Sequence, residues 1–96
     1  MFALIVDFIK PVDLVTPQIV PHNEWVKKYF DEGLFLVAGP KASKLGGVIL
    51  ARSIEKKNLM KILGEDPYVT ADVAEYKVIE FDCKATNKDL EFLKTL

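Results

Sequence analysis

The sequence predicts an α+β domain whose elements follow one another as β-α-β-β-α-β, with a short extra helix at the C-terminal end. Four segments are rich in β-branched and aromatic residues, and two segments between them carry apolar residues at helical spacing. Glycine or proline stands at most of the junctions. This order is that of the split β-α-β, or ferredoxin-like, arrangement.

The first strand is expected from Phe2 to Ile9, because this run is aromatic and β-branched and Pro11 prevents its continuation as a central strand. Apart from Asp7, both alternating sets of its side chains are apolar, whereas a strand with one wet face would alternate more cleanly. The segment from Lys10 to Val20 contains Pro11 and Pro17 and is predicted to be a loop or a broken turn.

The first helix is predicted to open with Pro21, to run to about Glu32 and to be closed by Gly33. Several of its residues recur at intervals of three and four and therefore share one face: His22, Trp25, Val26, Tyr29 and Phe30. His22 is the only histidine, and we expect it in the first turn, at the end of the stripe that faces the core.

The next two strands are expected to pair as a hairpin. The strand from Leu34 to Ala38 ends at Gly39-Pro40. A turn from Lys41 to Gly47 then leads into the strand from Val48 to Arg52. The turn lacks the Gly-x-x-x-x-Gly-Lys-Ser/Thr pattern of a phosphate-binding loop, so a plain hairpin loop is favoured.

A second helix is predicted from Ile54 to Leu63, capped by Ser53 and followed by Gly64, which is free to adopt a positive φ. Asp66 is then the expected N-cap of a short helical turn that begins with Pro67.

That turn is expected to end near Asp72, before a last strand from Ala74 to Asp82 whose mixed pattern indicates an edge or a partly wet strand. Behind this strand, Thr86 to Asp89 resembles a capping box with aspartate in place of glutamate. Leucines at positions 90, 93 and 96 follow, so the tail is predicted to form a short helix.

The composition excludes several classes of function. The net charge is −1 with both signs interspersed, which gives no field to attract nucleic acid or an anionic membrane. The apolar run from Met1 to Asp7 is too short for a signal or membrane segment. Cys83 is the only cysteine and cannot form an internal disulfide, which fits a reducing compartment. We expect a cytoplasmic protein with a single domain over residues 1–96.

Four short motifs together resemble the YciI-like (YCII-related) family, and the resemblance runs from the first strand through the last. They are Pro21-His22, the run from Gly33 to Pro40, Gly46-Gly47 and the run from Asp66 to Val69. The resemblance implies a dimeric ferredoxin-like α/β-barrel fold and a cleft in which a histidine and an aspartate are proposed as catalytic. His22 and Asp66 match those two positions.

Proteins of this family are known or suspected to act on small cyclic or aromatic molecules, including the dehydrochlorination of a chlorinated hydroxyquinol. This chain departs from the family in two ways. Asp72 stands where many members have a small residue, and the C-terminal helix follows where members usually end. Because either departure can reshape the cleft or the dimer, the resemblance does not carry the substrate over to this chain.

One histidine and one carboxylate are the minimum for acid–base chemistry, because the carboxylate fixes the tautomer and leaves the second ring nitrogen to move a proton. We expect His22 and Asp66 to meet in a cleft at the edge of the helical layer, near Gly39 and Pro40. A helix start and a helix end normally lie at opposite ends of the layer, so the segment after Gly64 must fold back. The alternative is that His22 only packs or caps its helix.

Tyr68 and Trp25 are candidates for the wall of a substrate pocket, together with Gly39 and Pro40. An aromatic residue at helical spacing, such as Trp25, more commonly belongs to the core, whereas Tyr68 lies outside the regular pattern. A metal site is not expected, since a single histidine with scattered carboxylates has no ligand spacing.

Asp7, Lys41 and Arg52 are further candidates for the site, but a structural role is favoured for each of them. Asp7 is expected at the end of the sheet or in contact with backbone groups. Lys41 and Arg52 are possible anion contacts, but solvated ends of a hairpin are the better interpretation.

Two functions remain open on these residues. The first is a small enzyme without a cofactor that performs proton transfer or elimination on a small organic molecule. The second is a non-catalytic dimeric module that binds a metabolite or a partner protein. A haem- or quinol-handling monooxygenase of the same superfold is disfavoured, because His22 would have to serve alone.

A homodimer is expected in either case. The first three strands are apolar on both sides, but two helices cover only one side of the sheet. An apolar face of several hundred Å² is unusual on a soluble monomer, so we expect two copies to pair through their open sheet faces.

Overall fold

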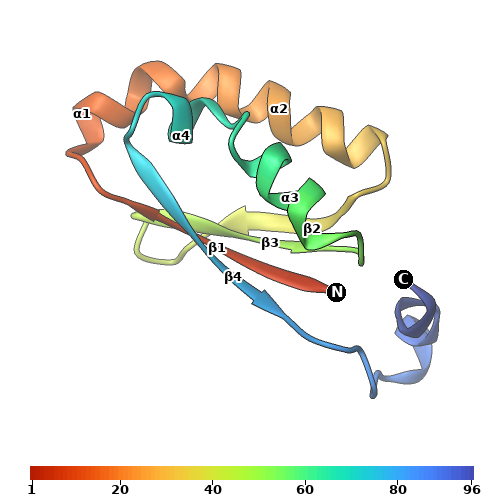
Figure 1. Cartoon of the computed structure of the whole chain (residues 1–96). Helices are drawn as coiled ribbons and strands as arrows, with labels where there is room; N and C mark the ends of the chain where they lie inside the picture. The colour runs from red at the N-terminus through yellow and green to blue at the C-terminus, as the bar shows by residue number, and fades with distance from the viewer.

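A computed structural model describes all 96 residues: a four-stranded antiparallel sheet carries helices on one face, and the C-terminal tail lies beyond one end of the sheet (Figure 1). The strands are β1 (Phe2–Phe8), β2 (Phe35–Pro40), β3 (Gly46–Ala51) and β4 (Ala74–Glu80). The helices are α1 (Val12–Val15), α2 (Ile19–Asp31), α3 (Lys56–Leu63) and α4 (Pro67–Thr70), with 3₁₀ segments at Thr16–Gln18 and Lys88–Thr95. The predicted ferredoxin-like α+β class is confirmed.

The strands lie in the order β2-β3-β1-β4, so β4 is an edge strand, as its mixed pattern predicts. Leu4 of β1 sits between Ile49 of β3 and Val78 of β4, and this register directs all three side chains to the helical side. Pro40 ends β2 on the other edge of the sheet, where a missing N–H is tolerated.

The core lies between the sheet and α2 and α3. Phe2, Leu4 and Phe35 of the sheet are fully or almost fully buried against Leu59 and Leu63 of α3. Burial of each such side chain stabilises the fold by about 1.5–3 kcal/mol. A second, smaller cluster lies at the other end of the sheet and is formed by Val6, Val15, Tyr68, Val73 and Ala74.

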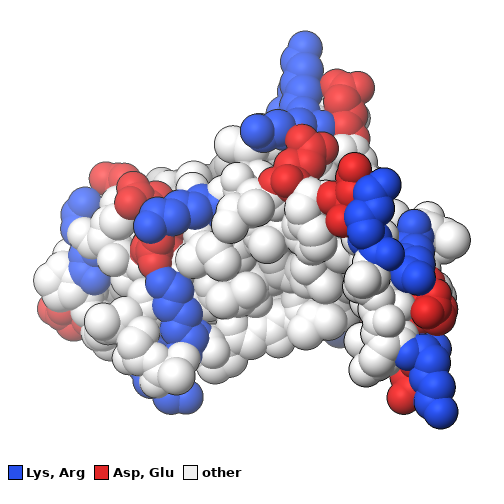
Figure 2. Space-filling view, turned by 90° about the horizontal axis from the view of Figure 1, so that it is seen from below, with Lys and Arg blue, Asp and Glu red and all other residues white.

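No helix covers the opposite side of the sheet, which we call the open face. Its apolar side chains come from all four strands: Ala3, Ile5, Val37, Val48, Leu50 and Ile79. Val37 is 61% exposed and Ile79 is 54% exposed. Figure 2 looks onto this side and shows a broad uncharged centre with charged side chains mainly around its rim.

The chain between β1 and α2 differs from the prediction of a loop over Lys10 to Val20. It forms α1 and a 3₁₀ turn, and α2 then begins at Ile19 rather than at Pro21. Proline fits the first turn of a helix, where its missing N–H would have no partner. Pro11 precedes α1 and Pro17 lies in the first turn of the 3₁₀ segment, so these prolines begin helical turns instead of interrupting them.

The hairpin strands are longer at the turn than predicted, because both Gly39-Pro40 and Gly46-Gly47 belong to strands. Gly46 has a φ of 151°, and a Cβ there would lie 1.9 Å from the carbonyl oxygen of Val6. Only glycine allows β3 to approach β1 this closely.

Three predicted caps are corrected. Ser53 does not cap α3, which begins at Lys56 with Glu55 in the cap position; the Ser53 hydroxyl instead accepts a hydrogen bond of 2.5 Å from the N-terminal ammonium. Gly64 follows α3 as predicted but has a φ of −66°, in the right-handed region. In the tail, Asn87 rather than Thr86 caps the helical segment, by accepting from the N–H of Asp89.

None of the helices has the length and apolar character needed to cross a membrane.

Candidate active site

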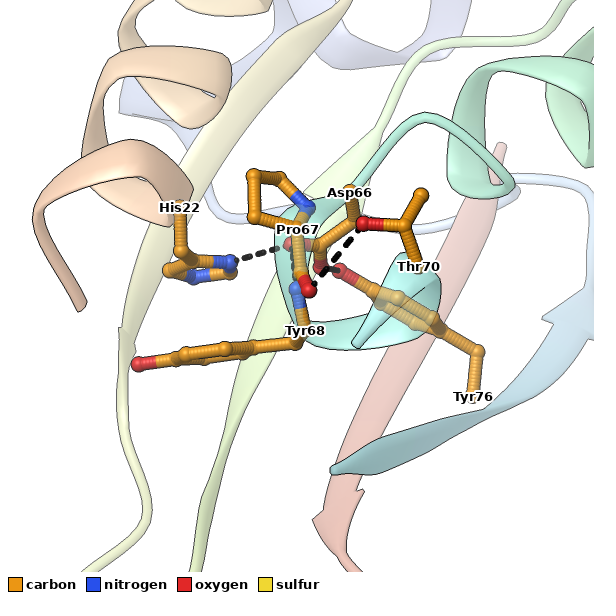
Figure 3. Close-up of polar contacts among 6 residues, drawn as sticks. All are labelled: His22, Asp66, Pro67, Tyr68, Thr70 and Tyr76. Carbon is orange, nitrogen blue, oxygen red and sulfur yellow. Dashed lines mark hydrogen bonds and ion pairs between the residues drawn. The ribbon is translucent and has the colours of Figure 1, made fainter. Parts of the chain in front are cut away.

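The His22 ring and the Asp66 carboxylate are in direct contact, with 2.7 Å between Nδ1 and Oδ1 (Figure 3). His22 lies in the first turns of α2, and Asp66 immediately precedes α4. After α3 the chain turns at Gly64 and Glu65, so that α4 lies beside α2 (Figure 1). The contact expected from the sequence is therefore present, and it depends on this reversal of the chain.

Asp66 is completely buried and has a partner for each carboxylate oxygen. Oδ1 accepts a hydrogen bond of 2.9 Å from the backbone N–H of Tyr68 in addition to its contact with His22, and Oδ2 accepts one of 2.6 Å from the Tyr76 hydroxyl. The predicted N-cap role is confirmed. A carboxylate without such partners would be very costly to bury, so the same contacts that satisfy Asp66 also fix its orientation.

The ring of Tyr68 stacks on the imidazole of His22, with 3.8 Å between the ring centroids and 11° between the planes. Figure 3 shows the two rings lying one above the other, on the same side of Asp66. Burial, and then the charge of Asp66, raise the pKa of the Tyr68 phenol above its ordinary value. Stacking and the contact with Asp66 together leave the His22 ring little freedom to turn.

Tyr76 is the member of this cluster that sequence reasoning missed. It reaches Asp66 from β4, on the opposite side of the carboxylate from His22 (Figure 3). Burial first, and then the charge of Asp66, raise the pKa of Tyr76 far above its ordinary value. The phenol therefore stays protonated and donates to Asp66. Its place beside Val78 on the helical side of the expected last strand was the available signal, but nothing in the sequence pairs it with Asp66.

Tyr76→Phe is expected to lower the free energy of unfolding by about 1–3 kcal/mol, since it removes one donor from a buried carboxylate. Urea denaturation measures the change. Tyr68→Phe is the matched control, because the hydrogen bonds of Tyr68 are made by its backbone N–H and carbonyl; its loss should stay within about 0.5 kcal/mol. Equal losses in the two variants would contradict a specific role for the Tyr76 hydroxyl.

A second hydrogen bond joins α2 to the segment before Asp66. The Tyr29 hydroxyl donates to Glu65 over 2.5 Å, and Lys28 lies 4.0 Å from the same carboxylate. Burial, followed by the bond to Glu65, raises the pKa of Tyr29 to about 12. The turn that places Asp66 is thus attached to α2 at two points, through Glu65 and through Asp66 itself.

This raised pKa predicts a loss of stability in alkaline solution. An unfolded chain releases the Tyr29 proton near its ordinary pKa of 10.0, whereas the folded chain holds it to about 12. The contribution of Tyr29 is therefore fully present below pH 10 and lost as the pH rises toward 12. The difference in unfolding free energy between the wild type and Tyr29→Phe should shrink over this range. A difference in unfolding free energy that stays constant as the pH rises toward 12 would contradict the raised pKa of Tyr29.

His22 and Tyr68 border a mostly apolar cavity of about 560 Å³. It lies between the segment from α1 to α2 and the sheet, against β1 and the β2–β3 hairpin. Gly39 and Pro40 line it, as the sequence predicts. Other lining side chains come from both layers and include Phe8, Val15, Ile19, Val26 and Ile49. Four of the predicted site residues thus meet at one cavity.

Trp25 does not line the cavity, which corrects its place among the pocket candidates; it lies in the core, the alternative that its helical spacing favours. Its ring lies in the core, 5.3 Å from the ring of Phe35 and 5.7 Å from that of Tyr29. Its helical spacing directs it to the sheet, one turn beyond His22, so it supports the site from behind.

Two acidic residues also lie apart from the cavity. Asp7 forms ion pairs with Lys41 and Lys77, and Asp72 is 82% exposed and pairs with Lys10 over 3.4 Å. Asp72 has a φ of 58°, and it ends the turn after α4 without lining the cavity. No three histidine, cysteine, aspartate or glutamate side chains gather closely enough to hold a metal ion.

The fold and the site define a small α+β domain in which a buried carboxylate orients one histidine beside an apolar cavity. The family model of the YCII-related domain matches residues 1–82, and the chain belongs to this family. The tail that carries the second 3₁₀ segment lies beyond the matched residues.

Among solved structures, the chain is similar to the 5-chloro-2-hydroxyhydroquinone dehydrochlorinase TftG from Burkholderia phenoliruptrix AC1100, in complex with 2,5-dihydroxybenzoquinone. The TM-score is 0.67 and the identity 16%, over 84% of this chain and 93% of that one. A likeness at this identity establishes a common fold. No curated protein matches the chain in sequence.

Proposed function

We propose that the chain is a small enzyme that performs proton transfer or elimination on a small cyclic or aromatic molecule. His22 is the acid–base residue, and Asp66 holds its ring. The observation that carries this proposal is the 2.7 Å contact between His22 Nδ1 and a fully buried carboxylate, at the border of an apolar cavity.

The contact favours the tautomer in which Nδ1 carries the proton and donates it to Asp66. Nε2 then keeps its lone pair and has no partner within the chain, so it serves as the base. In an elimination, Nε2 takes a proton from carbon, the electrons of the broken C–H bond form a double bond, and the leaving group departs with its own electron pair. The positive charge that arises on His22 is stabilised by Asp66. The proton then passes from Nε2 to solvent; in a proton transfer without a leaving group, Nε2 instead returns it to another atom of the substrate.

The cavity volume of about 560 Å³ lies within the usual range for small-molecule sites. TftG, whose fold this chain shares, is a dehydrochlorinase of a chlorinated hydroxyhydroquinone. Elimination of chloride from such a ring needs a base that takes up the proton, and this is the role proposed for His22. These points support a ring-sized substrate.

The proposal includes a homodimer through the open face, which would complete the dimeric α/β-barrel arrangement. Support comes from the uncharged centre of that face and from the exposure of Val37 and Ile79 (Figure 2).

A non-catalytic binding module is the second candidate. One observation favours it: only 14% of the His22 side chain is exposed, and Tyr68 covers one face of the ring. Such a ring could serve as one wall of a binding pocket.

A thermal-shift screen of small phenols, lactones and acids, followed by product analysis of each stabilising compound, separates the two candidates. Conversion of a bound compound supports the enzyme, and a compound recovered unchanged supports the binding module. Chlorinated hydroxyhydroquinones belong in the screen, with released chloride as the measurement.

A further inference from the structure

The cavity next to His22 has an uneven distribution of charge. Most of its wall is apolar, its neutral polar side chains are Thr16, Asn23 and Tyr68, and no aspartate or glutamate lines it. Apart from His22, Lys44 of the β2–β3 turn is the only lining residue with a basic side chain. Lys44 is an exposed residue, and no carboxylate among the lining residues opposes its charge.

The turn that carries Lys44 is held in place against β1. Lys41 forms an ion pair with Asp7, and its N–H donates to the carbonyl of Gly46 over 2.9 Å. The N–H of Phe8 donates to the carbonyl of Leu45 over 3.1 Å. Lys44 itself has a φ of 65°, which an L-residue rarely adopts, and its N–H donates to the carbonyl of Lys41 over 2.9 Å. Lys44 is thus presented by a fixed turn rather than by a free loop.

The two lysines of this turn differ in their partners. Lys41 is paired with Asp7, which it shares with Lys77, and the hydrogen bond from Lys41 holds the pKa of Asp7 below its ordinary value. Lys44 has no ion pair or side-chain hydrogen bond in the chain. Because Lys44 is exposed, its charge is available to an anionic ligand of the cavity, and its attraction for that ligand is screened by salt.

We propose that Lys44 selects an anionic ligand, so that the substrate of the site is a small, largely apolar ring that bears a carboxylate or a phenolate. The apolar wall takes up the ring, Lys44 contacts the anionic group, and His22 faces the reacting atoms. This inference rests on the proposed function for the position of the reaction, but the binding step that it describes is independent of turnover.

The test compares two probes of nearly equal size that differ in charge, 4-hydroxybenzoate and 4-hydroxybenzamide. Binding is followed by the NMR shifts of backbone amides along the cavity, at low and at high salt. The benzoate is expected to bind about three- to tenfold more tightly than the benzamide at low salt, and the preference should fall as salt is added.

Lys44→Gln should remove the preference for the anion, and Lys44→Arg should retain it. Lys61→Gln is the control, because Lys61 is an exposed lysine of α3 that forms no ion pair and does not line the cavity. Three results would overturn the proposal: equal affinity of the wild type for both probes, an undiminished preference in Lys44→Gln, or no shifts at the cavity with either probe at about 10 mM.

Different results would contradict the acid–base function of His22 and the anion selection by Lys44. Loss of the anion preference would leave acid–base chemistry at His22 intact, because the probe experiment measures no reaction. Inactive His22 variants that still prefer the anion would support both proposals, and fully active ones would leave the assignment of Lys44 standing.

Discussion

His22→Ala and Asp66→Asn are each expected to reduce turnover of an identified substrate by about 10²- to 10⁴-fold, while the chain remains folded. Alanine removes the only imidazole. Asparagine keeps an oxygen that can accept from the N–H of Tyr68, so α4 retains its cap, but it removes the charge that stabilises a protonated ring.

Asp72→Asn is the matched control, since it makes the same chemical change at a carboxylate that is 82% exposed and outside the cavity. It should retain full activity. Circular dichroism confirms that each variant is folded. Because the chain has one histidine, ¹⁵N NMR also reads the tautomer of His22 directly. Full activity in both site variants would show that the catalytic assignment is wrong.

Leu50→Lys is expected to convert a dimer into a monomer. Leu50 lies near the middle of the open face, where its register partners are Ala3 of β1 and Val37 of β2. Two copies paired by a two-fold axis would place the new charges in an apolar interface, where each is costly to desolvate.

Light scattering measures the mass of each variant at micromolar concentration. Leu14→Lys is the control, because it places the same charge at a leucine of α1 that is 51% exposed on the helical side. It should remain dimeric. A wild-type chain that is already monomeric would contradict the proposed interface, and so would a dimer that tolerates Leu50→Lys.

The sequence predicts those parts of the fold that depend on neighbours along the chain. Gly33 after α2 has a φ of 81°, as a residue that closes a helix commonly does, and Asp66 before Pro67 caps α4. The prolines between β1 and α2 predict a loop but begin helical turns instead, because proline both breaks helices and begins them and only the tertiary fold decides between the two. The need for glycine at Gly46 arises from Val6, forty residues away, and is invisible locally.

The residues of the candidate site divide in the same way, into those that local motifs predict and those that only the tertiary fold brings together. The contact between His22 and Asp66 was predictable because two motifs pointed to it and Pro67 offered a way for the chain to turn back. The hydrogen bonds from Tyr76 to Asp66 and from Tyr29 to Glu65 are not predictable, because each joins a side chain to a carboxylate on a different element. Trp25 is a pocket candidate by residue type, but its helical spacing favours the core, and the core is where it lies.

The position of Trp25 gives the protein a built-in optical reporter. Its ring is buried and lies 5.9 Å from the ring of His22. A protonated imidazole at this range quenches indole emission, and the chain has no second tryptophan to obscure the signal and no second histidine to cause it. The fluorescence intensity of Trp25 should therefore follow the charge of His22. Stopped-flow fluorescence could then follow proton uptake at the site within a single turnover.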